Sequence, residues 1–389
     1  MRADRVAEAI ENGAKTRKEI AERLDISAKY AASELKSMAQ DDECQIVRHE
    51  APHGPGYHYA VDERSGDVED LPVLGDREYD WESMVPSDDE AVYVQSGSEL
   101  DELRALIENR EATDQLVRVL LTGPPGTGKT TLARTIAAEQ GWPEITIQCT
   151  DDMRGSELLG TPQIVGGSSM WVDGKLTKAL LCAQERPVVL TVDEINRAPG
   201  RQQSSFFAPF DHRGRVEIDV RGETIEADPQ NLIVVATRNA GADFHVNNLD
   251  PALDRRLTVQ IDLPHLGMAR PDAEADLLAE QTPVDQPTAL EMVEIANTVR
   301  ERAADENDLD VQSSIPVSAL INWARAGVAL SQSAAIDDPL WTALERCVLE
   351  PYTGDDRSEI SGVFHQETLQ RSLEFDAVDA TTQEAVADD

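Results

Sequence analysis

The chain has 389 residues, enough for two or three domains that each bury a core of their own. Its hydrophobic content of 40% is normal for a soluble protein, and its apolar stretches fall far short of the roughly 20 residues that cross a bilayer. The four cysteines lie far apart, and the first residues lack the apolar segment of a secretory signal. The composition therefore argues against a membrane protein, a disulfide framework and a zinc site, and it predicts a cytoplasmic protein.

The formal net charge of −39 arises from 74 acidic and 35 basic residues. Such a surface can attract a basic partner, or it can keep a protein hydrated in concentrated salt. The chain has only seven lysines, none of them after Lys178, which resembles the composition of proteins from salt-accumulating haloarchaea and favours the second interpretation. Residues 1–60 do not share this acidity, because they carry nine basic residues against eleven acidic ones.

Residues 1–61 are predicted to form a small α+β domain. Thr16-Arg17-Lys18-Glu19 is typical of a capping box that opens a second helix, and Ser27 can cap a third. Two short strands are expected at Gln45–Arg48 and Tyr57–Val61. Three helices followed by a hairpin resemble a winged helix-turn-helix.

This N-terminal domain has two open interpretations, DNA binding and protein docking. The side chains that suit DNA are Lys29, Tyr30 and Lys36 on the third predicted helix and Arg48 on the wing. Glu34 lies on the same helix, and concentrated salt would weaken each phosphate contact. Both interpretations therefore stay open at this point.

Residues 62–90 contain twelve acidic residues and two arginines, which predicts a solvated acidic linker that Trp81 can anchor to the next domain. From about residue 91 to residue 268, strand signals alternate with helical ones. The expected strands are Val117–Leu121, Ile145–Gln148, Val188–Val192, Leu232–Ala236 and Thr258–Ile261. This alternation predicts an α/β domain with a mostly parallel sheet.

A glycine-rich loop follows the first of these strands and precedes a helical pattern. It reads Gly123-Pro124-Pro125-Gly126-Thr127-Gly128-Lys129-Thr130 and continues with Thr131, which is the Walker A motif. Its backbone N–H groups and the helix N-terminus can bind phosphate groups. Lys129 would bridge the β- and γ-phosphates, and the Thr130 hydroxyl would bind Mg²⁺. The loop predicts a site for ATP with Mg²⁺.

The strand Val188–Val192 ends in two carboxylates about sixty residues after that loop. This is the Walker B pattern, in which Asp193 would hold Mg²⁺ and Glu194 would orient and polarise the attacking water. The two motifs together predict hydrolysis of the nucleotide.

The Asp-Glu pair and the next strand resemble those of AAA+ ATPases. Asn239, at the end of Thr237-Arg238-Asn239, matches the sensor-1 residue that helps to place the lytic water. Leu253-Asp254-Arg255-Arg256-Leu257 stands where that family carries an arginine finger, and Arg255 is favoured over Arg256. A finger that reaches the neighbouring subunit implies a homo-oligomeric ring, commonly a hexamer.

Within the AAA+ ATPases, the chain resembles the MoxR type and its CbbQ, NirQ and NorQ relatives. The segments that carry this resemblance are Asp193–Pro199 (DEINRAP), Trp171–Thr177 (W-x-D-G-x-L-T), Cys149–Met153 with Glu157–Gly160, Phe210–Arg213, and Arg215–Ala227. The resemblance covers residues 90–265 well and 270–372 loosely, and it does not cover residues 1–80.

This resemblance implies an ATP-driven chaperone or remodeller that works with a partner bearing a von Willebrand A domain. Two inserted loops, about Thr161–Trp171 and Arg215–Ala227, would face the pore or the partner. The alternative is a DNA-associated ATPase or regulator that residues 1–61 bring to DNA.

The region after residue 268 is predicted to be helical only, with helices at Ala289–Arg302, Val317–Leu330 and Leu340–Leu349. It departs from the MoxR pattern, because no sensor-2 arginine falls in Ile315–Leu320, and Arg325 comes about two turns later. The expected organisation is therefore a winged-helix domain (1–61), an acidic linker (62–90), an AAA+ core built as a three-layer αβα sandwich (91–268), a helical lid (269–373) and an acidic, disordered tail (374–389).

Overall fold

The computed structural model describes residues 6, 9, 17–24, 31, 35, 46–50, 57–61, 78–87, 93–113, 116–165, 168–239, 249–304 and 315–371. The chain divides into two compact units. One comprises Met1–Pro72, Ile164–Met170 and Glu217–Glu223, and the other comprises the remaining residues.

The first unit contains helix α2 (Arg17–Arg23) and the antiparallel hairpin of β1 (Ile46–Glu50) and β2 (Tyr57–Val61). Ile46 pairs with Val61, and Glu50 pairs with Tyr57. Most of the first and third predicted helices lies outside the described residues. The winged helix-turn-helix therefore stays a prediction, as do the domain boundaries drawn from the sequence.

The second unit is built on a five-stranded parallel sheet with the order β11-β3-β10-β7-β4. Its strands are β3 (Val117–Gly123), β4 (Glu144–Gln148), β7 (Val188–Asp193), β10 (Leu232–Asn239) and β11 (Val259–Asp262). Three of them are nearly continuous runs of buried residues, as expected for a sheet covered on both faces. The predicted α/β class and all five predicted strands are confirmed.

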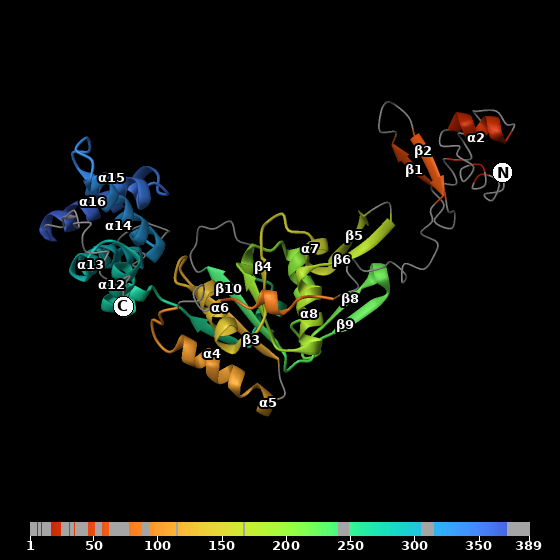
Figure 1. The fold of residues 1–389 in the computed structure, drawn as a ribbon, viewed down its shortest axis with the longest axis horizontal. Coiled ribbons are helices and arrows are strands. Elements are labelled where there is room, and N and C mark those ends of the chain that lie inside the picture. Colours follow the sequence, from red (N-terminus) through yellow and green to blue (C-terminus); the bar gives the residue numbers. More distant parts are fainter. Residues whose placement is uncertain are drawn as a thin grey trace, which may run out of the picture. The chain divides into compact units, whose positions relative to one another are not determined.

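Helices cover both faces of this sheet (Figure 1). On one face, α4 (Glu99–Glu108) and α6 (Lys129–Gln140) pack on alternate residues of β3 and β10. The residues of this core include Leu103, Leu132, Ile136, Val119, Leu121, Ile233 and Val235. Helix α8 (Lys175–Glu185) contacts β4, β7 and β10 from the other face. The result is a three-layer αβα sandwich, as predicted from the sequence.

The two inserts expected from the sequence contain strands as well as loops. The first is β5 (Gly160–Val165) with β6 (Ser168–Asp173), preceded by α7 (Gly155–Leu159). The second is β8 (Arg215–Ile218) with β9 (Glu223–Glu226), joined by the 3-10 turn η8 (Asp219–Arg221). Among the described residues of the inserts, the large apolar side chains of Ile164 and Val220 are exposed, at 80% and 52% of their surface.

The end of the predicted acidic linker lies against the core. Trp81, which precedes the short turn η4 (Glu82–Met84), is buried and donates from Nε1 to Glu185 of α8 at 2.9 Å. Tyr79 donates from its hydroxyl to Asp173 at 2.8 Å. Residues 78–86 are thus held by aromatic packing and hydrogen bonds despite their acidity.

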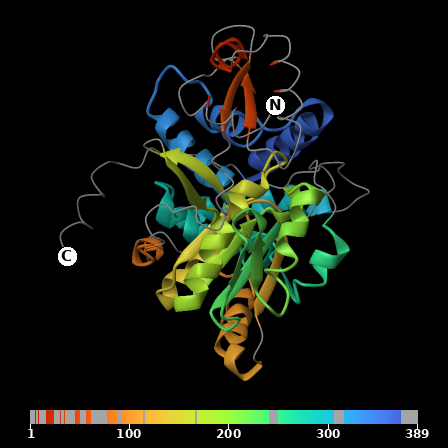
Figure 2. The same cartoon turned by 90° about the vertical axis from the view of Figure 1, so that its right-hand side faces the viewer.

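After the sheet and the short helix α11 (Leu266–Ala269), five of the described helices share a core of their own, drawn in teal to blue in Figure 2. They are α12 (Pro271–Gln281), α13 (Gln286–Ala304), α14 (Val317–Ser331), α15 (Pro339–Cys347) and α16 (Gly354–Arg371). Trp323 and Phe364 meet edge to face at the centre of this core, with ring centroids 5.6 Å apart. The expected helical region after the sheet is confirmed, while the predicted tail 374–389 lies outside the described residues. Among the described helices, none has the length and apolarity that a membrane span requires.

Candidate active site

The Walker A loop connects β3 to α6 and has a backbone that requires glycine. Gly126 has φ 74° and Gly128 has φ 85°, both in the left-handed region that side chains disfavour. A Cβ atom on Gly126 would lie 2.3 Å from the Cβ of Pro316, and one on Gly128 would lie 2.9 Å from the ring of Tyr93. The loop is therefore tightly enclosed as well as unusually folded.

Lys129 begins α6, and its side chain is buried against the loop that precedes it. Its ammonium group donates to the carbonyl oxygens of Gly123 at 3.0 Å and Pro124 at 2.6 Å. Burial lowers the pKa of Lys129 to about 8, and the nearby carboxylates of Asp193 and Glu194 only partly oppose this.

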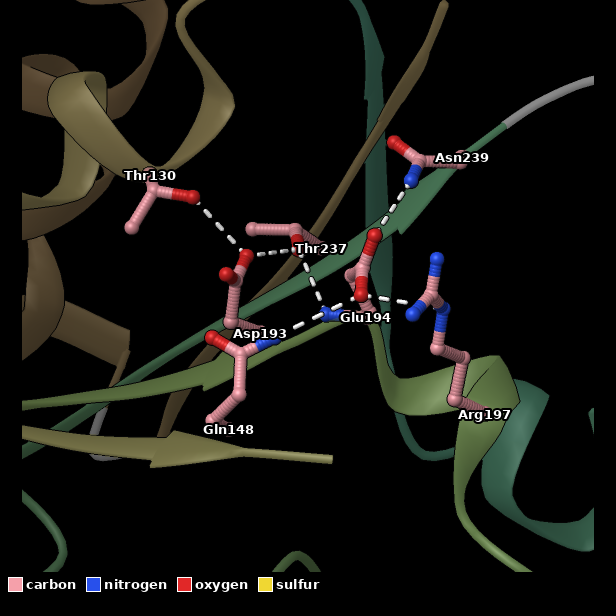
Figure 3. Close-up of polar contacts among 7 residues, drawn as sticks. All are labelled: Thr130, Gln148, Asp193, Glu194, Arg197, Thr237 and Asn239. Atoms are coloured by element: carbon pink, nitrogen blue, oxygen red, sulfur yellow. Dashed lines mark hydrogen bonds and ion pairs between the residues drawn. The ribbon is translucent and has the colours of Figure 1, made fainter. Parts of the chain in front are cut away.

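Asp193, at the end of β7, accepts hydrogen bonds from two hydroxyl groups on the same oxygen, Oδ1. Thr130 donates to it at 2.8 Å, and Thr237 of β10 donates at 2.6 Å (Figure 3). A threonine hydroxyl and a carboxylate in contact are oxygen donors of the kind that Mg²⁺ takes alongside substrate phosphates and water. Thr130 and Asp193 thus fit the predicted magnesium site.

Glu194 follows directly and is the only non-glycine residue with a positive φ among the described residues, with φ 53° and ψ 48°. Its backbone N–H donates to the Thr237 hydroxyl at 2.9 Å. Asn239, at the end of β10, donates from Nδ2 to Glu194 Oε1 at 2.7 Å (Figure 3). Because β7 and β10 are parallel neighbours, their carboxyl ends bring the predicted catalytic glutamate and the predicted sensor-1 asparagine together.

These residues surround one cavity of about 260 Å³. Its lining consists of Pro125, Gly126, Gly128, Lys129, Thr130, Thr131, Asp193, Glu194 and Asn239. Loop amides, a buried ammonium group and a helix N-terminus meet there, and this set suits the phosphate groups of a nucleotide. The same loop also contains Gly123, Pro124 and Thr127, which do not line the cavity. Within the loop, the Thr127 hydroxyl donates to the Pro124 carbonyl at 3.1 Å.

The two candidate finger arginines differ in their surroundings. Arg256 donates to the Ala252 carbonyl at 2.8 Å and stacks on Phe207, with its guanidinium 5.0 Å from the ring centroid. Arg255, at the end of α10 (Pro251–Asp254), is exposed, and its side chain has no polar contact with the described residues. Neither arginine lines the cavity of its own chain.

Arg325 does not take the place of a sensor-2 arginine in this structure. It donates from Nε and Nη2 to the Gln281 carbonyl, at 3.1 and 2.8 Å, so it links α14 to the end of α12. Pro316, directly before α14, lies against Gly126 of the Walker A loop.

Three polar residues of the site were not predicted as functional. Thr237 bonds Asp193, whereas Gln148 and Arg197 contact Glu194 Oε2 at 3.4 and 3.0 Å (Figure 3). The positions of two of these residues in the sequence could have indicated their roles. Gln148 ends a strand of the sheet, and Arg197 lies within the DEINRAP segment.

The parallel sheet, the Walker A loop and the carboxylates at the end of β7 define a P-loop protein with the AAA+ fold. Residues 118–257 match the family model described as "AAA domain (dynein-related subfamily)". The AAA domain supports ATPase activity, in agreement with the sequence prediction.

Comparison with curated proteins finds homologues among the proteins that the sequence resembles. NorQ of Paracoccus denitrificans (strain Pd 1222) is 29% identical over 268 residues, which cover 69% of this chain and 89% of NorQ. CbbQ of Hydrogenophilus thermoluteolus is 28% identical over 222 residues, 57% of this chain and 76% of CbbQ. The denitrification regulatory protein NirQ of Stutzerimonas stutzeri is 27% identical over 198 residues, 50% of this chain and 67% of NirQ. The chain is therefore similar to NorQ, CbbQ and NirQ at 27–29% identity, as the sequence motifs predicted.

Proposed function

We propose that this chain hydrolyses ATP and uses the released energy to remodel a partner protein. The observation that carries the catalytic half is the position of Glu194, whose carboxylate is bonded to Asn239 and lies beside the Thr130–Asp193 pair. The homology to NorQ, CbbQ and NirQ supports the remodelling half, because the resemblance to this group implies an ATP-driven chaperone.

Each site residue has a proposed task in this reaction. The loop from Gly123 to Thr131 binds the phosphate groups through its amides, and Lys129 supplies a positive charge. Thr130 and Asp193 hold Mg²⁺, which neutralises charge on the phosphates when it is bound. Thr237 keeps Asp193 in position by its hydrogen bond.

Glu194 accepts a hydrogen bond from the attacking water and so directs a lone pair of that water toward the γ-phosphorus. Asn239 donates to Oε1 of Glu194 and limits the rotation of the carboxylate. The left-handed backbone at Glu194 fits such a role, because strained residues persist where the surrounding structure fixes a functional side chain.

The reaction is proposed to take place in a homo-oligomeric ring, most simply a hexamer. Arg255 is the better finger candidate because it is exposed, whereas Arg256 is engaged with Ala252 and Phe207. In a ring, Arg255 would extend to the γ-phosphate bound by the neighbouring subunit.

The proposed partner is a protein with a von Willebrand A domain, as the MoxR-type resemblance implies. Ile164 and Val220 are exposed on the two inserts that the resemblance assigns to the pore or the partner, so they are the apolar side chains to substitute first in a test of that contact. Deletion of residues 1–61 followed by a DNA-retention assay would test the alternative, in which DNA is the partner.

The catalytic assignment is tested by Glu194→Gln in a high-salt buffer. The variant should bind ATP with unchanged affinity and hydrolyse it at least roughly 100-fold more slowly, because the amide cannot accept the proton of the water. Glu226→Gln, a change at an exposed position on β9, is the matched control and should keep the wild-type rate.

The remodelling assignment uses the same variant as a trap. If ATP drives a cycle of partner binding and release, Glu194→Gln loaded with ATP should retain a von Willebrand A partner that the wild type releases. Wild-type hydrolysis by Glu194→Gln would contradict the catalytic half, and equal retention by both proteins would contradict the remodelling half.

A further inference from the structure

Side chains from three elements meet the carboxylate of Glu194 (Figure 3). Asn239 from β10 donates to Oε1 at 2.7 Å. Gln148 from β4 and Arg197 from the 3-10 turn η6 (Ile195–Arg197) contact Oε2, at 3.4 and 3.0 Å. Of the three donors, only Asn239 was expected from the sequence.

Arg197 differs from the other two donors in charge. Its contact with Glu194 is an ion pair at 3.0 Å, whereas Asn239 and Gln148 offer neutral amide groups. The Gln148 contact on the same oxygen is longer and correspondingly weaker. Arg197 is therefore the dominant partner of Glu194 Oε2.

The backbone between the two residues keeps this pair together. Glu194 takes the left-handed conformation and caps η6, and the Arg197 N–H donates to the Glu194 carbonyl at 2.7 Å. Ile195 and Asn196, between them, are buried and hold the turn in the protein. The position of Arg197 is thus determined by the same turn that gives Glu194 its unusual backbone.

Stability alone does not account for the pair. The Arg197 side chain is 39% exposed and that of Glu194 is 19% exposed, and exposed ion pairs contribute little to folding. What the contact does determine is orientation. An ionised carboxylate has about four acceptor positions, so three donors leave about one lone pair for a water molecule. Because the two oxygens are held by donors from different elements, the carboxylate cannot rotate freely.

We propose that Arg197 is a positioning residue for hydrolysis, which fixes Glu194 through Oε2 so that its remaining lone pair meets the attacking water. This inference rests on the proposed function, in which Glu194 orients that water. Asn239 and Arg197 then act as a pair, one on each oxygen of the carboxylate.

Arg197→Ala tests the inference through steady-state ATP hydrolysis and equilibrium nucleotide binding. The kcat should fall roughly 10- to 100-fold, since a misplacement of about 1 Å can have that effect, while the Kd for ATP should change less than about twofold. Arg197→Lys should recover part of the rate, because it restores the charge without the planar guanidinium. Arg201→Ala removes an exposed arginine from the adjacent helix α9 (Gly200–Gln203) and serves as the control.

A double-mutant cycle separates positioning from a merely structural role. If Arg197 acts through Glu194, adding Arg197→Ala to Glu194→Gln should cause no further loss of rate, whereas a structural effect would add to it. Melting temperatures show whether Arg197→Ala folds, and Arg197→Gln provides a second variant that retains hydrogen-bond donors if it does not.

Different results would contradict the role of Arg197 and the proposed function of Glu194. An unchanged or raised kcat in Arg197→Ala, next to a strong loss in Glu194→Gln, would overturn the role of Arg197 alone. Fully additive losses in the double mutant would overturn it as well. If Glu194→Gln keeps the wild-type rate, the proposed function of Glu194 is wrong and this inference falls with it.

Discussion

Lys129 shows how burial changes the chemistry of one residue. An ordinary lysine has a pKa of 10.5 and is charged at pH 8, but the pKa of Lys129 is lowered to about 8 because its ammonium group is buried between the loop carbonyls. The charged form is the one that attracts phosphate. Nucleotide affinity should therefore depend on pH around pH 8.

The expected result is a Kd for ATP that is constant near pH 7 and rises above pH 8, by at most about tenfold per pH unit as one proton is lost. Isothermal titration between pH 7.0 and 9.5 would measure it. Lys129→Arg should bind with little pH dependence, because its guanidinium stays charged throughout this range. Equal pH profiles for the two proteins would contradict the assignment.

Substitutions of Arg255 and Arg256 should have different effects on hydrolysis and on stability. Arg255→Ala is expected to lower kcat roughly 1000-fold or more in assembled rings, as loss of an arginine finger does, without destabilising the subunit. Arg256→Ala should retain hydrolysis but lower stability by about 1 kcal/mol, because it removes the stacking on Phe207. ATPase assays with parallel thermal unfolding measure both effects. The reverse pattern would reassign the finger to Arg256.

Among the elements, the helical region contains a buried ion pair in addition to its apolar core. Arg300 of α13 donates from Nη1 and Nη2 to the two carboxylate oxygens of Glu274 in α12, both at 2.8 Å. Arg300 also donates from Nε to the carbonyl of Ile315 at 2.9 Å, one residue before the Pro316 that touches Gly126. This pair therefore links two helices to the segment that lies on the Walker A loop.

Arg300→Met should destabilise the protein by about 3–5 kcal/mol, because it leaves the Glu274 carboxylate buried without a partner. The double variant Glu274→Leu/Arg300→Met should recover most of that loss, since apolar replacement of both charges removes the desolvation penalty. Denaturant unfolding monitored by circular dichroism compares the two. A double variant no more stable than the single one would show that the Ile315 contact, rather than the ion pair, dominates.

At the scale of the whole molecule, the net charge of −39 should make stability depend on salt. Mutual repulsion among carboxylates opposes the compact state, and mobile ions screen it. The melting temperature should therefore rise with KCl concentration, with NaCl giving a similar rise. A variant that neutralises two exposed acids of α12, Asp276→Asn with Glu280→Gln, should show a smaller rise. A melting temperature that is flat or falls with salt would contradict the solvation interpretation of the charge.

Local sequence was sufficient for the strands and for the Walker motifs. The strand Val188–Val192 and the loop before Lys129 are contiguous, and their backbone conformations follow from β-branched residues and glycines within a few positions. The left-handed backbone at Glu194 was not predictable, because nothing in the side chain of glutamate favours it. The surrounding hydrogen bonds impose it.

What the sequence by itself determined is the class of the site: a phosphate-binding loop and a strand ending in Asp193 and Glu194, whose chemistry resides in contiguous residues. Only the tertiary structure decided which side chains surround that site. Gln148 and Arg197 meet Glu194 because strand ends and a buried turn converge there, and Arg325 turns to Gln281 instead. The reason is physical: backbone conformation follows from neighbouring residues, whereas a contact across elements depends on how whole strands and helices pack.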